Sequence, residues 1–135
     1  MTTATADLTA PATGRLLRTS LVLDGIATGL TGVLIAALSG MLDTVLGPST
    51  AFVLGVGLFF VAYGATVLVI GTRGMINRGA AGAVAGANLL WTVVSVIVVI
   101  AGTLSLTTLG VVTALALAVV TTVFAELQIT GLRRS

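Results

Sequence analysis

Asp24, Asn88 and Glu126 are strongly polar residues that lie inside long apolar stretches of the sequence. An ionisable side chain in a membrane span costs about 2.5–3.5 kcal/mol on insertion scales, and such residues are by default candidates for function. Carboxylates can take up and release protons, and an amide beside them can donate and accept hydrogen bonds. These residue types could therefore bind protons or recognise a small polar group.

Asp24, Asn88 and Glu126 lie at similar distances along the sequence from the arginines that flank their apolar stretches. Counted from the nearest arginine, Asp24 lies six residues into its apolar stretch, Asn88 ten and Glu126 seven. Tyr63 and Gln128 lie at neighbouring depths. The spacing predicts one polar cluster of these five residues on the arginine side of the membrane, and no metal or cofactor is expected in it.

A second interpretation gives the two carboxylates a structural task only. A carboxylate near a helix end can pair with an arginine and fix the helix register. The candidate pairs are Asp24 with Arg18 or Arg78, and Glu126 with Arg73 or Arg133. Both interpretations are open at the level of the sequence.

The basic residues define the elements that must position this cluster. All six are arginines and fall into three pairs, separated by two gaps of 54 residues: Arg15 and Arg18, Arg73 and Arg78, Arg133 and Arg134. Each gap can hold two membrane spans of about 20 residues and a turn. Because cytoplasmic loops are rich in arginine, the three pairs are expected to anchor the cytoplasmic face, with both termini in the cytoplasm.

Composition requires a membrane environment. Charged residues make up 7% of the chain and hydrophobic residues 57%, against about 25% charged in soluble domains, and the mean hydropathy is +1.22. Long apolar segments in lipid must be helical, because a helix satisfies its own backbone polar groups. The chain has no Cys, no His and four acidic residues, so enzyme chemistry is not expected. The net charge of +2 is interpreted as a signal for the orientation of the chain in the membrane, and no nucleic-acid partner is expected.

The expected fold is all-α, a four-helix transmembrane bundle of two antiparallel hairpins. Residues 1–14 are small and polar and are expected to form a disordered cytoplasmic tail. Residues 15–135 form a single transmembrane domain with spans at about 19–42, 51–72, 79–101 and 106–129. Gly47-Pro48 is expected to break the helix between the first and second spans, and Ser49 or Thr50 is expected to cap the second span.

Small residues at helical spacing indicate where helices approach closely. The first span carries Gly25, Gly29 and Gly32, and the third carries Gly82 and Gly86. These glycines are expected to be packing seams within the bundle, although the same seams could serve a homodimer. Trp91, near the middle of the third span, is expected to pack against another helix.

Four short motifs resemble those of small, uncharacterised four-helix integral membrane proteins of actinobacteria. The motifs are Leu16-Leu17-Arg18, Leu46-Gly47-Pro48, Asn88-Leu89-Leu90-Trp91 and Gln128-Ile129-Thr130-Gly131-Leu132-Arg133-Arg134. They extend over most of the chain. The resemblance implies a multi-pass protein of the bacterial inner (plasma) membrane and implies no activity.

The sequence favours a structural or accessory protein over an enzyme. Its expected partners are membrane lipids, another membrane protein or a second copy of the chain. The alternative is a small oligomeric transporter that works through the predicted polar cluster. The substitutions Asp24→Asn and Glu126→Gln separate the two. Unchanged phenotype and flux would exclude transport, and a loss of bundle stability alone would favour structural pairing of the carboxylates.

Overall fold

The computed structural model describes the backbone of residues 2–135 and the side chains of residues 14–135. Five helices follow one another: α1 (Thr2–Ala37), α2 (Ser39–Leu46), α3 (Thr50–Thr72), α4 (Arg78–Ala101) and α5 (Thr108–Arg134). Four helical segments are long and apolar enough to cross a membrane, namely Gly14–Ala37 of α1 and the whole of α3, α4 and α5. The predicted all-α fold is therefore confirmed, and the chain has the character of a multi-pass membrane protein.

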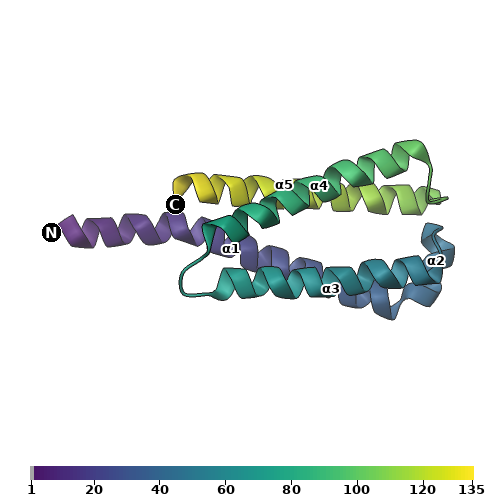
Figure 1. Ribbon diagram of the computed structural model, residues 1–135, viewed down its shortest axis with the longest axis horizontal. Coiled ribbons are helices and arrows are strands. Elements are labelled where there is room, and N and C mark those ends of the chain that lie inside the picture. The colour runs from purple at the N-terminus through teal and green to yellow at the C-terminus, as the bar shows by residue number, and fades with distance from the viewer. Residues whose placement is uncertain (1) are drawn as a thin grey trace.

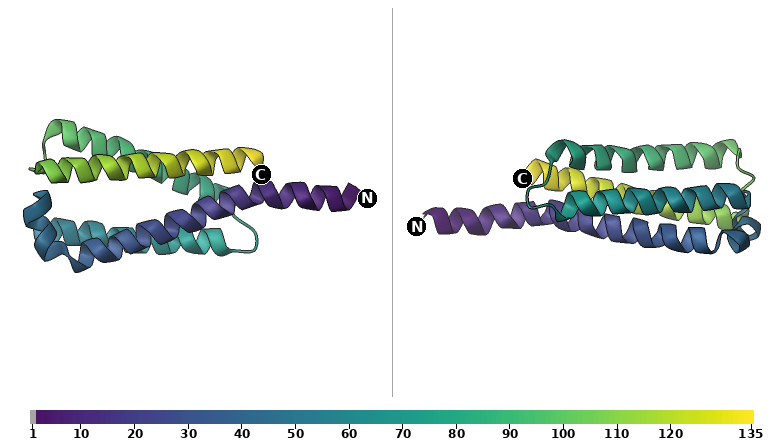
Figure 2. Two further views of the ribbon diagram at one scale, coloured as in Figure 1. Left: turned by 180° about the vertical axis from the view of Figure 1, so that it is seen from behind. Right: turned by 60° about the horizontal axis from the view of Figure 1, so that its bottom comes forward.

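The long helices form two antiparallel hairpins. The backbones of α1 and α3 and those of α4 and α5 run closest together, whereas the backbones of α3 and α4 approach at few positions. Figure 1 shows the C-terminus and the α3–α4 loop at one end of the bundle, with α2 and the α4–α5 loop at the other. We name the first of these the arginine end, because all six arginines lie there, and the second the α2 end. The two hairpins are also joined at the α2 end, where the Thr107 amide donates to the Leu46 carbonyl at 3.0 Å (Figure 2).

The first span ends earlier than the sequence predicts. Instead of running to residue 42, α1 ends at Ala37 and a separate short helix, α2, follows. At the break the Ser39 hydroxyl donates to the Ala36 carbonyl at 3.0 Å, and Gly40 follows directly. Serine back-bonding and Ser/Gly pairs are common causes of helix kinks. The side chains of residues 1–13 lie outside the described part of the chain. The disordered tail expected at residues 1–14 therefore stays a prediction.

Side-chain caps fix where the later helices begin. Ser49, one of the two residues expected to cap the second span, accepts a hydrogen bond from the Phe52 amide at 3.2 Å. Asn77 caps α4 through the Ala80 amide at 3.0 Å, and Thr107 caps α5 in the same way. The chain leaves α4 through Gly102 in the left-handed conformation, φ +67°, which glycine adopts without strain. These caps satisfy backbone groups at the helix ends and so fix where each helix begins or ends.

The α1–α3 hairpin is built on the predicted glycines of α1. A Cβ placed on Gly64 of α3 would lie 2.5 Å from the Gly29 amide nitrogen and 2.7 Å from the Gly25 carbonyl oxygen. One on Gly32 would lie 2.6 Å from the Gly57 carbonyl oxygen. The two backbones therefore touch directly, which is the arrangement that small residues permit in lipid.

Gly82 and Gly86 of α4 behave differently from the glycines of α1. A Cβ placed on either residue would meet no atom within 4 Å, so the seam expected there within the bundle is not formed. The α4–α5 hairpin closes instead further along α4, where Thr92 meets α5. Its hydroxyl lies 2.7 Å from the Thr121 hydroxyl and donates to the Ala118 carbonyl at 3.1 Å.

Candidate functional site

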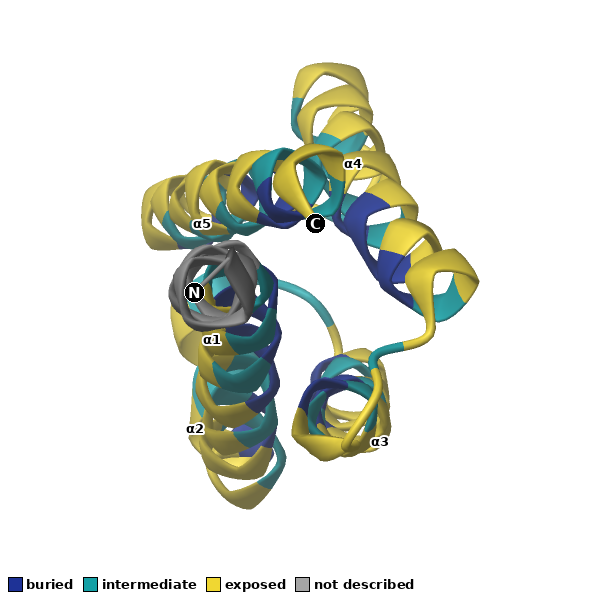
Figure 3. Cartoon of the chain, turned by 90° about the vertical axis from the view of Figure 1, so that its left-hand side faces the viewer, coloured by how far each residue is buried: buried dark blue, intermediate teal, exposed yellow. Residues whose placement is uncertain are grey.

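Buried residues face the interior, where the long helices meet (Figure 3). Asp24 of α1 lies there and is fully buried. Its Oδ2 accepts hydrogen bonds from Asn88 Nδ2 of α4 and from Gln128 Nε2 of α5, each at 2.8 Å. Its Oδ1 accepts one from the Thr28 hydroxyl at 2.8 Å. A single carboxylate thus joins the α1–α3 hairpin to both helices of the α4–α5 hairpin.

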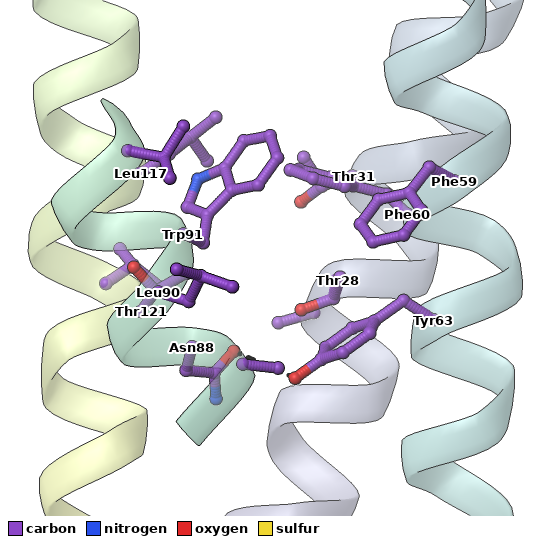
Figure 4. Close-up of a pocket in the computed structure, with 14 residues that line it drawn as sticks. Thr28, Thr31, Phe59, Phe60, Tyr63, Asn88, Leu90, Trp91, Leu117 and Thr121 are labelled. Carbon is purple, nitrogen blue, oxygen red and sulfur yellow. Dashed lines mark hydrogen bonds between the residues drawn. The ribbon is translucent and has the colours of Figure 1, made fainter. Parts of the chain in front are cut away.

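Asn88 uses every polar atom of its side chain in this arrangement. Besides Asp24, its amide nitrogen donates to Gln128 Oε1 at 3.1 Å. Its Oδ1 accepts from the Tyr63 hydroxyl of α3 at 3.2 Å, a bond that Figure 4 shows. We call Asp24, Thr28, Tyr63, Asn88 and Gln128 the polar cluster. It holds four of the five residues that the sequence placed together.

Glu126 is the fifth, and the structure separates it from the cluster. Gln128 is fully buried, whereas Glu126 lies on the exposed face of α5. Two residues along a helix correspond to a rotation of about 200°, so the two side chains point in nearly opposite directions. Depth along the helix was predicted correctly, but depth alone does not determine direction.

The hydrogen-bond partners of Asp24 are all neutral, so the pairing with Arg18 or Arg78 considered from the sequence is not formed. Arg18 instead donates to carbonyls at the end of α3: Gly71 at 2.8 Å, Arg73 at 2.6 Å and Gly74 at 3.0 Å. Arg78 donates to the Leu132 carbonyl of α5 at 2.7 Å. Both arginines cap the C-terminal ends of neighbouring helices, where carbonyls lack helical partners and a positive charge is favourable.

The other predicted anchors lie at the same end of the bundle. Arg15 is exposed in α1, Arg73 follows α3, and Arg133 and Arg134 occupy the last turn of α5. Among the side chains described, none of these four forms an ion pair with Glu126. The pairing of Glu126 with Arg73 or Arg133 is therefore not formed either.

An apolar cavity of about 260 Å³ adjoins the polar cluster (Figure 4). Thr28, Tyr63 and Asn88 form its polar end. Trp91 lies on the other side and packs edge-on against Phe60, with ring centroids 4.9 Å apart, so the predicted contact of Trp91 with another helix is confirmed. The Trp91 indole nitrogen is buried and has no hydrogen-bond partner.

A second cavity, of about 590 Å³, continues from the first towards the α2 end. Phe59, Trp91, Val94 and Leu117 line both cavities, so the two cavities adjoin each other. The remaining lining of the larger cavity is almost wholly apolar, and Phe52, Val56, Val98 and Leu106 are among it. We call the two adjoining cavities the inter-hairpin cleft. The cleft lies between the polar cluster and the α2 end, where Thr107 at the start of α5 donates to the Leu46 carbonyl at 3.0 Å.

Sequence reasoning did not place Phe59 and Phe60 at a site. Their stacking on Trp91 requires α3 and α4 to be neighbours, a relation that the loop between them permits but does not fix. Thr92 was also missed, since a lone threonine in a span is not a strong signal. The run of Thr121 and Thr122 in α5 was the one clue to its partner.

What the cluster can do chemically follows from its partners. Five neutral or acidic side chains satisfy one another's hydrogen bonds, with no metal-binding group of three or more His, Cys, Asp or Glu among the residues described. The arrangement can hold helices together or present Asn88 and Tyr63 to a molecule in the cleft. No protein-family model, curated protein or solved structure matches this chain.

Proposed function

We propose that the protein is a structural or accessory membrane protein that binds the acyl chain of a lipid in its inter-hairpin cleft. The observation that carries this proposal is the pair of adjoining apolar cavities in the cleft, with the polar cluster at one end. Binding sites are typically apolar spaces with a few convergent polar groups. Here Thr28, Tyr63 and Asn88 supply those groups.

The lining of the cleft favours an acyl chain. The larger cavity is lined almost wholly by apolar side chains, and lipid chains surround any multi-pass protein. The small-residue seam of α1 is already occupied by α3, so it offers no free surface to a partner.

The proposed orientation places the arginine end and both termini in the cytoplasm of a bacterial cell, with the helices in the plasma (inner) membrane. The support is the arrangement of the six arginines at one end of the bundle, which matches the usual bias of cytoplasmic loops. A reporter that is active only in the cytoplasm, fused after Ser135, should be active. An inactive reporter of that kind, with an active periplasmic one, would reverse the orientation.

Trp91 provides a direct test of the cleft, because it is the chain's one tryptophan. Lipids with brominated acyl chains quench tryptophan fluorescence on contact. A matched reference carries Trp91→Phe and Val119→Trp, since Val119 is 64% exposed on α5. We expect brominated lipids to quench Trp91 at least as strongly as the reference, although Trp91 is half-buried.

A blocking variant completes this experiment. Gly55 lines the larger cavity and has no atom within 4 Å of an added Cβ, so a side chain can begin there, and Gly55→Leu is expected to narrow the cleft. It should reduce quenching at Trp91. Quenching of the reference but not of Trp91 would show that no chain enters the cleft and would refute the proposal.

Transport is the second candidate, because Asn88 and Tyr63 belong to both the polar cluster and the cavity. A bound molecule could therefore sense the protonation of Asp24 through Asn88. In that case Asp24→Asn would abolish proton-coupled flux in reconstituted vesicles while the protein stayed folded. An unchanged flux or phenotype in that variant rules the transport function out.

A further inference from the structure

A separate cavity of about 520 Å³ lies at the arginine end, between the start of the first span and the beginning of α4. Its lining residues are Gly14, Arg15, Leu17, Arg18, Ile76, Arg78 and Ser135. We call this space the arginine pocket. It shares no residue with the inter-hairpin cleft.

The arginine pocket carries a concentrated positive charge. Three arginines line it, Arg15, Arg18 and Arg78, and among the side chains of residues 14–135 no Asp or Glu lines it. A carboxylate at Ser135 would offset only one of the three charges. The pocket is therefore complementary to an anion.

Two of the three guanidinium groups are held in place by neutral acceptors. Arg18 uses three N–H groups on carbonyls at the end of α3, and Arg78 uses two on Leu132 and Ser135. Arginine has five N–H donors, so each keeps donors for a further acceptor. The carbonyls fix the orientation of the charges without neutralising them, which prepares the pocket for a planar or tetrahedral oxyanion.

A groove of about 330 Å³ adjoins this pocket through Arg78, which lines both. It lies between α4 and α5, with Gly82 and Gly86 exposed in its lining and Arg133 at its mouth. These are the glycines whose Cβ positions are open. A charged pocket at the end of the spans therefore continues into a shallow apolar groove along them, the arrangement of a lipid headgroup and its chain.

We propose that the arginine pocket binds the phosphate of an anionic phospholipid, with one acyl chain of that lipid in the groove over Gly82 and Gly86. Basic pockets between helices at the membrane surface are suited to anionic headgroups, and each arginine near the surface contributes about 1 kcal/mol. Free phosphate would use the same arginines but would gain nothing from the groove. This site does not depend on the inter-hairpin cleft.

The test measures lipid binding to the full-length protein in a neutral detergent. Dioctanoyl phosphatidylglycerol is the anionic probe, and dioctanoyl phosphatidylcholine is the zwitterionic reference. We expect the anionic lipid to bind more tightly, and Arg15→Gln and Arg78→Gln each to weaken it about fivefold. The matched control is Arg134→Gln, an exposed arginine outside the pocket and the groove, which should leave the affinity unchanged.

Two further measurements distinguish the lipid from free phosphate. Gly86→Leu places a side chain in the groove at an open position and should weaken binding of the anionic lipid. Inorganic phosphate at the same concentration should not displace the bound lipid. Equal binding of both lipids, or an equal loss in Arg134→Gln, would overturn the proposal. Displacement by inorganic phosphate with no effect of Gly86→Leu would assign the pocket to free phosphate and overturn it as well.

Protein folding does not limit this test. Arg78 caps the C-terminal end of α5, so Arg78→Gln can lower the stability of the protein. Among the residues described, Arg15 does not cap a helix, so Arg15→Gln tests lipid binding on its own. The result is also separable from the cleft, because neither Arg15 nor Gly86 lines it. Loss of headgroup binding with unchanged quenching of Trp91 would leave the proposed function in place.

Discussion

At the scale of single residues, Asp24 is the centre of the molecule. It is fully buried and accepts three hydrogen bonds from neutral donors on α1, α4 and α5. Removing a buried acceptor leaves its donors unsatisfied, at about 1–3 kcal/mol for each group. The cluster therefore contributes to stability whether or not it also contacts a ligand.

A graded series of substitutions tests this role. Asp24→Leu should lower the free energy of unfolding by about 3–5 kcal/mol, because it strands three donors. Asp24→Asn should cost about 1 kcal/mol, since an amide oxygen can still accept from Asn88 and Gln128. Thermal unfolding in detergent, followed by circular dichroism, measures the order of the midpoints.

Glu126→Leu is the matched control for that series. Glu126 is a carboxylate at a similar depth but on the exposed face of α5, and its replacement should leave the midpoint unchanged or raise it slightly. A fall in the unfolding midpoint as large as that of Asp24→Leu would show that Glu126 has a structural partner and belongs to the polar cluster.

At the scale of helices, close backbone contact holds α1 to α3. Gly64→Ala would place a methyl group 2.5 Å from the Gly29 nitrogen, and overpacking of this kind typically costs about 1–3 kcal/mol. The control is Gly55→Ala in the same helix, where the methyl group meets no atom within 4 Å. The control should be neutral or gain up to about 1 kcal/mol from helix propensity. Equal midpoints for the two variants would argue against direct contact between α1 and α3.

The α2–α3 turn depends on pH through Asp43. The hydroxyls of Thr50 and Thr44 donate to the Asp43 carboxylate and lower its pKa from the ordinary value of 3.8. A carboxyl with a lowered folded pKa stabilises the fold above its unfolded pKa, and that contribution is lost as the pH falls through the folded pKa. Asp43→Asn should therefore unfold at a lower temperature than the wild type at pH 6, with the difference shrinking as the pH falls below 3.8. A difference that is the same at both pH values would contradict this.

The elements also show what the sequence could and could not reveal. Hydropathy and span length predict the four long helices, because crossing a membrane imposes both. They do not reveal the break at Leu38, where a single Ser39 hydroxyl and a neighbouring glycine interrupt an apolar segment. Gly82 and Gly86 have the spacing of a seam, but spacing alone does not say whether a second helix is present on that face.

The candidate site was predictable to the same degree. The depths of Asp24, Asn88 and Gln128 follow from counting residues, because rise per residue in a helix is constant. The direction of Glu126 and the aromatic contacts of Trp91 depend on how each helix is rotated and which helices are neighbours. Those properties arise from packing between segments far apart in the chain.

At the scale of the whole molecule, the two hairpins meet at the polar cluster and again at the α2 end, where Thr107 donates to the Leu46 carbonyl at 3.0 Å. The inter-hairpin cleft lies between these two contacts, and the arginine end carries a second, charged pocket. We propose that the cleft holds an acyl chain and that the charged pocket holds a lipid headgroup. In this proposal the protein is a small lipid-binding protein whose two hairpins are joined by the polar cluster.

The most direct test of this account is mass analysis of the protein extracted from its native membrane into lipid particles and then transferred to detergent. The account predicts that phospholipid stays bound in a fixed ratio to the protein. It also predicts that Gly55→Leu loses the chain held in the cleft. Recovery of a stoichiometric partner protein, with no lipid retained, would contradict the account and assign the molecule to a protein complex instead.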